Sequence, residues 1–580
     1  MNLFLKKYTL KMATTFVCLV IFASCSSKND PVTPAVDGTV LNVTVKGIEE
    51  VILIKDSDAS TSNLRASSNN RISGESSTTT NGTSLVSLGD VDAFIDVKEN
   101  AGTSNLVQSA IGTNTTISTT ANNKSIASSN SPLRAANVLM GTGVQYRLLI
   151  YNSSNVLIVN KLAISGTNPL IKIDAGKNYT WYAVSINEST GTMPDINSSG
   201  IIAKSSLTNK DVLYASGSIS TVYGENYLNI IFRRNTAKIQ VELNVRGTFG
   251  TIDNATSISV VKNSTNTNVI QIGDLDIKTG NYSSLVDVNP ILGSSMVAVA
   301  GNPSNTVKTA TFYTVNPAAI TANNFKIKLN ELKIAIEDAR VRSFASNKIY
   351  TYPAAYTPTQ GSSYVITMRV IDSPVKVKGI YWARTNLRYN AAHMDQYRLK
   401  PNPGGSTSAE VNTEFWNWKS TTPTGATGSF DPCAAAYPAG TWRMPTAAEW
   451  QLLAQPNEKR SEAGFFFGVQ YAYVWTRDSD NPINSAYDDP DLFVALGGYR
   501  TTSGTVTGSP AGIGLGGLAA GTFSYWSGTG INATTATEAR ASFAIVFFVP
   551  VWTNVTYPSA PKAEGKNIRC VRQITNSTGV

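Results

Sequence analysis

Tryptophan is confined almost entirely to one part of this chain. Eight of its nine tryptophans lie between Trp382 and Trp552, whereas Phe94 is the one aromatic residue from Ser26 to Gln145. Tryptophan brings a large rigid apolar surface that needs a packed core, and a segment without such residues buries too little apolar area to offset its ordering entropy. The sequence therefore predicts a compact C-terminal domain and a loosely structured N-terminal tract.

The first residues have the layout of an export signal. Three lysines precede an apolar run from Met12 to Phe22, and this run is too short to span a bilayer. Small residues before Cys25 and polar residues after it resemble the lipobox of bacterial lipoproteins. The resemblance implies that residues 1–24 are removed, that Cys25 carries lipid, and that the mature protein is a surface-exposed lipoprotein of the outer membrane. An ordinary signal peptide with an incidental cysteine is the alternative.

Residues suited to catalysis or metal binding are scarce. His393 is the sole histidine, and one imidazole cannot build a multi-histidine zinc site. No glycine-rich nucleotide-binding motif stands between an expected strand and helix. The formal charge of +9, which is +6 without the three signal lysines, is spread along the chain, and this argues against nucleic-acid binding. We therefore expect no cofactor, no metal and no enzymatic activity.

The cysteines fit an exported chain. Cys18 lies in the signal and Cys25 is the expected lipid acceptor, so Cys433 and Cys570 remain as thiols. An isolated pair in an exported protein favours one disulfide over metal binding. The sequence therefore predicts a bridge between Cys433 and Cys570.

The tract from 25 to 135 is rich in Ser, Thr, Asn and Gly, and most of it is expected to be a loose linker. One part, Val40 to Val45, differs. Leu41, Val43 and Val45 alternate there with Asn42, Thr44 and Lys46, the period-2 pattern of a half-buried strand. Val51 to Ile54 predicts a second short strand. A strand that precedes a polar tract must find its pairing partner further along the chain.

Two β-sandwiches are expected next, at 136–230 and 231–373, which makes the fold mainly β. Short β-branched or aromatic runs alternate there with Asn, Ser and Gly turn residues. The runs of the first sandwich are Tyr146–Tyr151, Val156–Val159 and Tyr179–Val184, and those of the second are Leu228–Arg234, Ala237–Leu243 and Tyr364–Val370.

The region from 375 to 580 is expected to be a separate domain with long ordered loops, because it holds almost all the tryptophans and a cluster of glycines. Thr446 to Ala454 predicts a helix. Thr446 is the expected N-cap, and Glu449, three residues on, completes a capping box. Pro456 follows the expected end of the helix.

Over residues 25–373 the order of these signatures resembles the fimbrillins, the subunits of type V pili. Besides the lipobox and the early strand, the matching segments are Tyr146–Tyr151, Ala175–Thr180, Arg233–Ile239 and Tyr364–Val370. The resemblance implies that an arginine-specific protease removes the first strand and that a donor strand of a neighbouring subunit fills the vacated groove. Backbone groups left open in such a groove demand a partner. The alternative is that Val40–Val45 is a permanent edge strand.

Three arginines between the first strand and Tyr146 are the candidate processing sites: Arg65, Arg71 and Arg134. All three lie in polar sequence, the kind of segment in which proteases cut. Arg134 is preferred because it lies nearest to the Tyr146 strand and because a cut there discards the whole polar tract together with the strand.

Residues 375–580 resemble the FISUMP or major paralogous domain, a C-type-lectin-like module of bacterial surface proteins with an α+β fold. The matching segments are Gly379–Arg384, Asp431–Cys433, Thr441–Trp450 and Asn567–Val571. The resemblance places Cys433 and Cys570 at the structural bridge of that family. Trp442, Arg443 and Trp450 are expected to be core and helix-anchoring residues rather than a ligand site. The acidic turn Tyr487–Asp491 is expected to be solvated, with calcium ligation as the alternative.

The leading interpretation is a minor or tip subunit of a type V pilus that presents a lectin-like module for adhesion. Its expected partners are other pilus subunits through donor-strand exchange, the outer membrane through the lipid anchor, and a host glycan or protein ligand. A lipid-anchored glycan-binding protein that never polymerises is the second interpretation. An enzyme in the C-terminal domain is the third.

Overall fold

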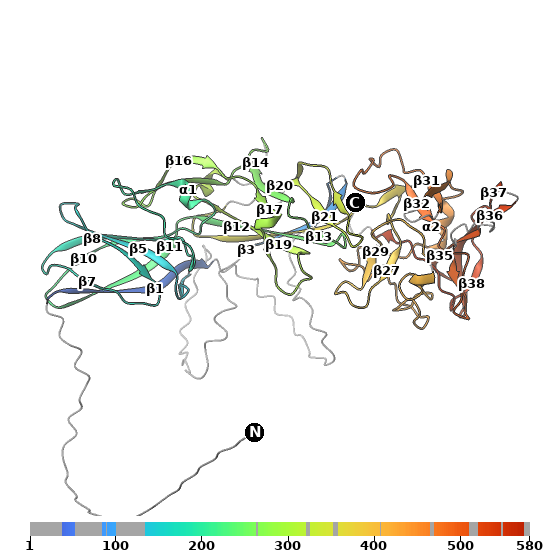
Figure 1. Cartoon of the computed structure of the whole chain (residues 1–580), viewed down its shortest axis with the longest axis horizontal. Helices are drawn as coiled ribbons and strands as arrows, with labels where there is room; N and C mark the ends of the chain where they lie inside the picture. The colour runs from blue at the N-terminus through green and yellow to red at the C-terminus, as the bar shows by residue number, and fades with distance from the viewer. Residues whose placement is uncertain are drawn as a thin grey trace, which may run out of the picture.

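The computed structural model describes residues 38–52, 84–88, 90–99, 134–262, 265–320, 325–351, 358–406, 408–463, 469–509, 520–546 and 549–573. In this part of the chain nearly all regular structure is β, so the fold is mainly β. Figure 1 shows three bodies in a row along the long axis of the molecule, from the strands around β1 (Val40–Ile52) to a C-terminal domain. None of the described helices is long and apolar enough to cross a membrane.

The first body is an eight-stranded sheet that folds over into a sandwich. The strand order is β4 (Arg134–Val138), β1, β11 (Glu225–Arg234), β10 (Leu213–Ser220), β8 (Asn178–Ser185), β5 (Gln145–Asn152) and β6 (Leu157–Ile164), and β7 (Leu170–Lys172) also pairs with β1. β10 pairs with β11 through just two of its residues, Leu213 and Tyr214. Both layers contribute to one core, in which the rings of Tyr146 and Phe232 lie 6.0 Å apart.

Strand β11 shows how the sequence specifies a layer of this sandwich. Its buried residues alternate with exposed ones over most of its length, the period-2 pattern of a strand with one face against a core. The boundary predicted at 230 falls inside β11. Asn235 and Thr236 connect β11 to the next strand, so the first body ends after Arg234.

The second body is a sandwich of a six-stranded and a four-stranded sheet around one core. The larger sheet has the order β18 (Val297–Ala298), β19 (Val307–Thr314), β12 (Ala237–Gly247), β24 (Ser363–Asp372), β3 (Val91–Glu99) and β2 (Ser84–Ser87). The smaller one has the order β17 (Ile291–Leu292), β14 (Ser257–Lys262), β20 (Phe325–Glu331) and β23 (Lys348–Thr351). Short elements flank them: β9 (Ile201–Ile202), α1 (Lys204–Leu207), β13 (Thr251–Ile252), β15 (Gln271–Asp276), β16 (Tyr282–Asp287), β21 (Lys333–Ala335) and β22 (Val341–Ser343).

The polar tract contains more structure than its composition predicts. Strands β2 and β3, within the expected linker, form a hairpin that adds to β24 in the second body. Val91 and Ala93 of β3 are fully buried there and alternate with acidic Asp92, so the period-2 signal was present in the sequence. Val51 also belongs to no separate strand: it continues β1, whose register shifts between Val45 and Gly47.

The C-terminal domain starts directly after β24, with β25 at Val375. One four-stranded sheet consists of β25 (Val375–Val377), β26 (Ile380–Trp382), β39 (Val571–Arg572) and β29 (Trp442–Arg443). A second is formed by β35 (Ala520–Gly530), β36 (Thr535–Val546), β37 (Val549–Trp552) and β38 (Ser559–Pro561). The smaller sheets are β30 (Glu458–Ala463) with β31 (Val469–Trp475) and β32 (Leu492–Ala495), β27 (Leu387–Tyr389) with β28 (Tyr397–Leu399), and β33 (Tyr499–Arg500) with β34 (Val506–Thr507). The predicted helix is α2 (Ala447–Leu452), with Thr446 as N-cap and both hydrogen bonds of the capping box.

Candidate functional site

Strand β1 lies inside the first sheet, with partners on both sides. It runs parallel to β11 from Val40 to Glu49, and its other side pairs antiparallel with β7 at one end and with β4 at the other. It is therefore not an edge strand in this structure. Its position joins a segment from the start of the chain to a strand more than 180 residues further on, since Val40 pairs with Glu225.

One face of β1 belongs to the core of the first sandwich. Leu41, Val43 and Ile48 are buried there. Each such side chain stabilises the fold by about 1.5–3 kcal/mol through the apolar surface that it removes from water. The ion pair between Glu49 and Arg233 is exposed on the arginine side and adds little. β1 is therefore held by apolar contacts and by its backbone hydrogen bonds.

The irregularity in β1 lies at Gly47, where the backbone has a φ of +139°. A Cβ at this position would lie 2.5 Å from the carbonyl oxygen of Val138 in β4. Glycine is required there because both the backbone conformation and the close approach of β4 exclude a side chain. The second half of β1 is therefore fitted to β4.

Among the candidate processing sites, the structure describes only the backbone of Arg134. This residue begins β4 and pairs in register with Ile52 of β1. A paired strand backbone must separate before a protease can bind it, since cleavage concentrates in exposed loops. Arg65, Arg71 and the expected lipid acceptor Cys25 lie outside the described residues.

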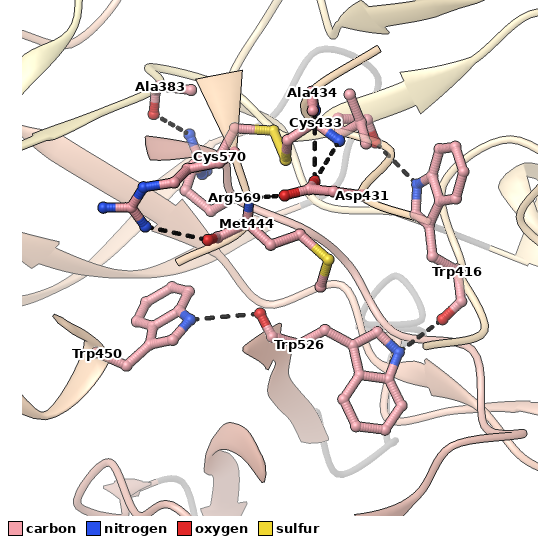
Figure 2. Close-up of a disulfide and its surroundings, with 12 residues drawn as sticks. Ala383, Trp416, Asp431, Cys433, Ala434, Met444, Trp450, Trp526, Arg569 and Cys570 are labelled. Carbon is pink, nitrogen blue, oxygen red and sulfur yellow. Dashed lines mark hydrogen bonds between the residues drawn. A yellow bond between two sulfur atoms is a disulfide. The ribbon is translucent and has the colours of Figure 1, made fainter. Parts of the chain in front are cut away.

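A disulfide joins Cys433 to Cys570, and both cysteines are fully buried. Figure 2 shows Asp431 beside this bridge. One oxygen of its carboxylate accepts hydrogen bonds from the backbone N–H groups of Cys433 and Ala434, and the other accepts one from Met444. Asp431 thus fixes the loop that carries Cys433 against the segment between β29 and α2. The bridge closes a segment of 137 residues, most of the C-terminal domain.

The tryptophans around the bridge form a core rather than an open surface. Trp442 and Trp450 are buried, and the indole of Trp450 donates to the backbone carbonyl of Trp526. The indole of Trp526 in turn donates to the carbonyl of Trp416 at 2.7 Å (Figure 2). The indole N–H groups of Trp450 and Trp526 are thus satisfied by backbone within the core. That of Trp442 is buried without a hydrogen-bond partner among the described residues, and the guanidinium of Arg572 lies 4.4 Å from the centre of the Trp442 ring.

Arg443 anchors the start of helix α2. Its guanidinium donates two hydrogen bonds to the carboxylate of Glu449, which also completes the capping box with Thr446. Burial opposes ionisation of Glu449, but the hydrogen bonds from Arg443 and from the Thr446 backbone outweigh it and lower the pKa of this carboxyl. The predicted helix-anchoring role of Arg443 therefore matches its contacts.

The acidic turn at 487–491 makes ion pairs with arginines. Asp488 accepts from Arg340 of the second sandwich, Asp489 from Arg460, and Asp491 from Arg477 at 3.1 Å. Within the described ranges no group of three or more His, Cys, Asp or Glu side chains is arranged to hold a metal ion. The turn is therefore a contact between the second sandwich and the C-terminal domain, and the prediction of a purely solvated turn is wrong for it.

Tyr487 lies at the centre of this contact between the two bodies. The guanidinium groups of Arg342 and Arg384 lie 4.3 Å and 4.4 Å from the centre of its ring. Its hydroxyl donates to Asp372, which also accepts from Arg342. Burial raises the pKa of Tyr487 well above its usual value and also raises the pKa of Asp372, despite the opposing effect of Arg342. Two arginines and a tyrosine thus join the last strand of the sandwich to the C-terminal domain.

The hairpin of β2 and β3 reaches the same junction. Asp92 forms an ion pair with Arg572 at 3.0 Å, and these side chains are 4% and 2% exposed. The backbone carbonyl of Asp90 accepts hydrogen bonds from Ser373 and Asn484. The sequence predicted neither contact. No local pattern marks the pairing, because Asp92 lies on the face of β3 opposite Val91 and Ala93, where an acid is ordinary in a strand.

The amino-acid sequence matches no protein-family model and no curated protein. Several solved structures are similar in part. They include a candidate cell adhesion protein from Bacteroides fragilis (14% identity, 44% of this chain and 88% of that one, TM-score 0.27). A fimbrial assembly protein from Parabacteroides distasonis (13% identity, 39% and 83%, TM-score 0.22) and a candidate cell adhesion protein from Bacteroides ovatus (11% identity, 41% and 91%, TM-score 0.23) are two more. At these scores the similarities carry no argument about function.

Proposed function

We propose that this chain is a structural and adhesive component of a type V pilus, exported as a lipoprotein through Cys25, and that it occupies a minor or tip position. The observation that carries the proposal is the placement of β1. This strand fills the interior of a sandwich formed otherwise by residues 134–234. A single cut in the sequence between β1 and β4 makes it a separate peptide. Its loss would leave backbone groups of β11 unpaired and apolar side chains uncovered, and a donor strand from a neighbouring subunit would satisfy both.

The contacts of β4 and of the hairpin favour Arg65 or Arg71 over Arg134 as the processing site. Arg134 is paired with β1, so a protease reaches it only after β4 opens. A cut at Arg134 also separates the β2–β3 hairpin from the body that it completes, because this hairpin precedes Arg134 in sequence. A cut at Arg65 or Arg71 releases β1 alone. The preference for Arg134 drawn from the sequence is therefore revised in this proposal.

The C-terminal domain supports a terminal position in the fibre. Strand β39, which contains Val571 and Arg572, pairs with both β26 and β29 inside this domain, and Arg572 is buried. A segment built into a folded domain is not free to enter the groove of another subunit. The subunit can then accept a strand and cannot donate β39, which suits an end of the fibre. The lectin-like module would present the adhesive surface there.

Arginine-to-lysine variants test the proposal, because lysine keeps the charge and removes the arginine that the protease recognises. We expect R65K/R71K to keep β1 and to stay out of fibres isolated from cells, and R134K to enter them like the unaltered chain. Immunodetection of the chain in purified fibres measures the difference. Normal incorporation of R65K/R71K would contradict the choice of site, and absence of the unaltered chain from every fibre would contradict the pilus role.

A lipid-anchored protein that never polymerises is the second candidate, and one observation favours it. Gly47 is fitted to β4, as in a strand that stays in place. This candidate predicts that the surface protein always begins at lipidated Cys25 and binds a glycan as a single subunit. Replacing Cys25 by alanine should remove the chain from the outer membrane under either candidate. Normal membrane fractionation of that variant would refute the lipoprotein claim itself.

A further inference from the structure

The β2–β3 hairpin (Ser84–Glu99) occupies a site built by two other parts of the chain. Strand β3 pairs antiparallel with β24 in continuous register from Asp372, opposite Val91, to Tyr364, opposite Glu99. Val91 and Ala93 are fully buried in the core of the second sandwich. The site is therefore the edge of β24, with an apolar floor that accepts small and medium side chains.

Charged and polar groups close one end of this site. Arg572, from the C-terminal domain, pairs with Asp92, and its guanidinium also lies 4.4 Å from the centre of the Trp442 ring. Lys348, from the second sandwich, forms an ion pair with Asp90 at 2.5 Å and donates to the carbonyl of Leu88 at 2.6 Å. An incoming hairpin must therefore offer acids at the positions of Asp90 and Asp92.

Long stretches of sequence separate the hairpin from its neighbours. Residues 53–83 lie between β1 and β2, and residues 100–133 lie between β3 and β4. A connection of about 30 residues has an extended span of at most roughly 100 Å. Such lengths permit the hairpin to reach the equivalent site on an adjacent copy of the chain.

We propose that the β24 edge with Arg572 is an interface between copies of this chain, which takes the β2–β3 hairpin of a second copy in place of its own. The contacts are identical in the two arrangements, as in domain swapping, so local concentration decides between them. The covalent connection gives each chain's own hairpin an effective concentration of the order of mM. Exchange therefore rises as copies are crowded together. The exchange requires neither processing of β1 nor membership of a pilus.

The empty site is the disfavoured state. Without Asp92, the buried Arg572 keeps its hydrogen bond to the backbone carbonyl of Asp372 but loses its ion-pair partner, and a buried charge that loses its partner is strongly destabilising. The loss of the Val91 and Ala93 side chains would also leave part of the core of the second sandwich open. A hairpin that leaves its own site is thus replaced by another, and two copies that exchange become linked.

Two single-cysteine chains test the exchange. Phe94 and Arg369 face each other in the register of β3 and β24, at a separation that a disulfide can bridge. Full-length chains carrying F94C or R369C, both with Cys18 and Cys25 replaced by serine, are mixed under mild oxidation. We expect a covalent heterodimer whose yield rises with protein concentration. F94C and R369C in one chain should form an intramolecular bridge in dilute solution, which verifies the register.

Asp92→Asn supplies the control that separates recognition from general destabilisation. On the F94C chain it should lower the heterodimer yield about tenfold, because the altered hairpin must displace an unaltered one. On the R369C chain the same substitution should raise the yield, because the resident hairpin is then the weaker one. An intramolecular bridge without any heterodimer, no intramolecular bridge, or the same direction of change on both chains would overturn the proposal.

Discussion

Strands β1 and β3 both come from the N-terminal tract, and each completes a different sandwich. β1 pairs parallel to β11 and presents Leu41, Val43 and Ile48 to the first core. β3 pairs antiparallel to β24 and presents a buried acid as well as apolar residues. β1 is held by apolar contacts and backbone hydrogen bonds. β3 is held by the same two kinds of contact and also by an ion pair between the second body and the C-terminal domain.

Under the proposed function, the difference separates a strand that is removed, β1, from one that must be present, β3. In that proposal, removal of β1 leaves a groove that an apolar strand of suitable pattern from a neighbouring subunit fills. Removal of β3 leaves a buried guanidinium without its carboxylate and weakens the contact with the C-terminal domain. The same tract therefore combines a strand held by apolar contacts with a hairpin whose site has a charge requirement.

The largest expected effect concerns the bridge that supports Arg572. Replacing Cys570 by serine removes a crosslink that closes 137 residues, and in the chain-entropy model this costs about 5 kcal/mol. Arg572 lies two residues further on, so we expect faster amide hydrogen exchange in β3 and little change in β1. Equal loss of protection in both strands would show that the two sandwiches do not respond separately.

Asp92→Ala tests the charge requirement of β3 directly. The substitution removes the ion-pair partner of the buried Arg572, which typically lowers the free energy of unfolding by about 3–5 kcal/mol. Glu49→Ala is the matched control on β1, because Arg233, the partner of Glu49, is largely exposed and such pairs contribute about 0–1 kcal/mol. Urea denaturation of the two variants gives the comparison. Similar losses would remove the distinction between the strands.

Leu41→Ala tests the apolar anchoring of β1. A fully buried leucine replaced by alanine costs about 2–5 kcal/mol, depending on how far the core closes around the cavity. The loss should appear in the unfolding of the first sandwich and leave the β3 amides protected. Asn42→Ala, on the opposite face of the same strand, should change stability by much less. A result in which both variants are neutral would mean that β1 contributes little to the sandwich.

The smallest expected effect is on the pH dependence of the junction. Burial, and then the charge of Arg398, lowers the pKa of His393, which lies in a pocket with Arg246, Asp395 and Glu337. Because the folded-state pKa is below the unfolded one, stability is complete above about pH 6.5 and falls as the pH drops through the folded-state value. His393→Gln should flatten this slope in thermal melts between pH 7.5 and 5. A steeper slope in the variant would contradict the sign.

Local sequence patterns predicted where the strands and the helix lie better than they predicted which strands pair. The alternation in 40–45, the closing strand at 364–370 and the capping box at Thr446 all depend on neighbouring residues, and the structure contains each of them. The pairing of Val40 with Glu225 depends on residues far apart in sequence, which no local period encodes. The disulfide was predicted because Cys18 lies in the signal and Cys25 is the expected lipid acceptor, which leaves Cys433 and Cys570 as a pair.

The hairpin was missed for a physical reason that the sequence contained. The prediction of a loose linker depended on the scarcity of aromatic residues in the polar tract, whereas β3 contributes the aliphatic residues Val91 and Ala93 to the core. The ion pair of Asp92 with Arg572 was beyond the reach of sequence reasoning, since it forms only when β39 is folded beside β26 and β29. Buried charge pairs across bodies are set by tertiary structure.

The mature N-terminus of the chain in isolated fibres tests the central claim most directly. The account predicts that it begins at Ala66 or Ile72, so that β1 is gone and the β2–β3 hairpin remains attached ahead of β4. Edman sequencing or mass spectrometry of the fibre-bound chain gives the answer. A start at lipidated Cys25 would contradict the removal of β1, and a start at Ala135 would contradict the retention of the hairpin.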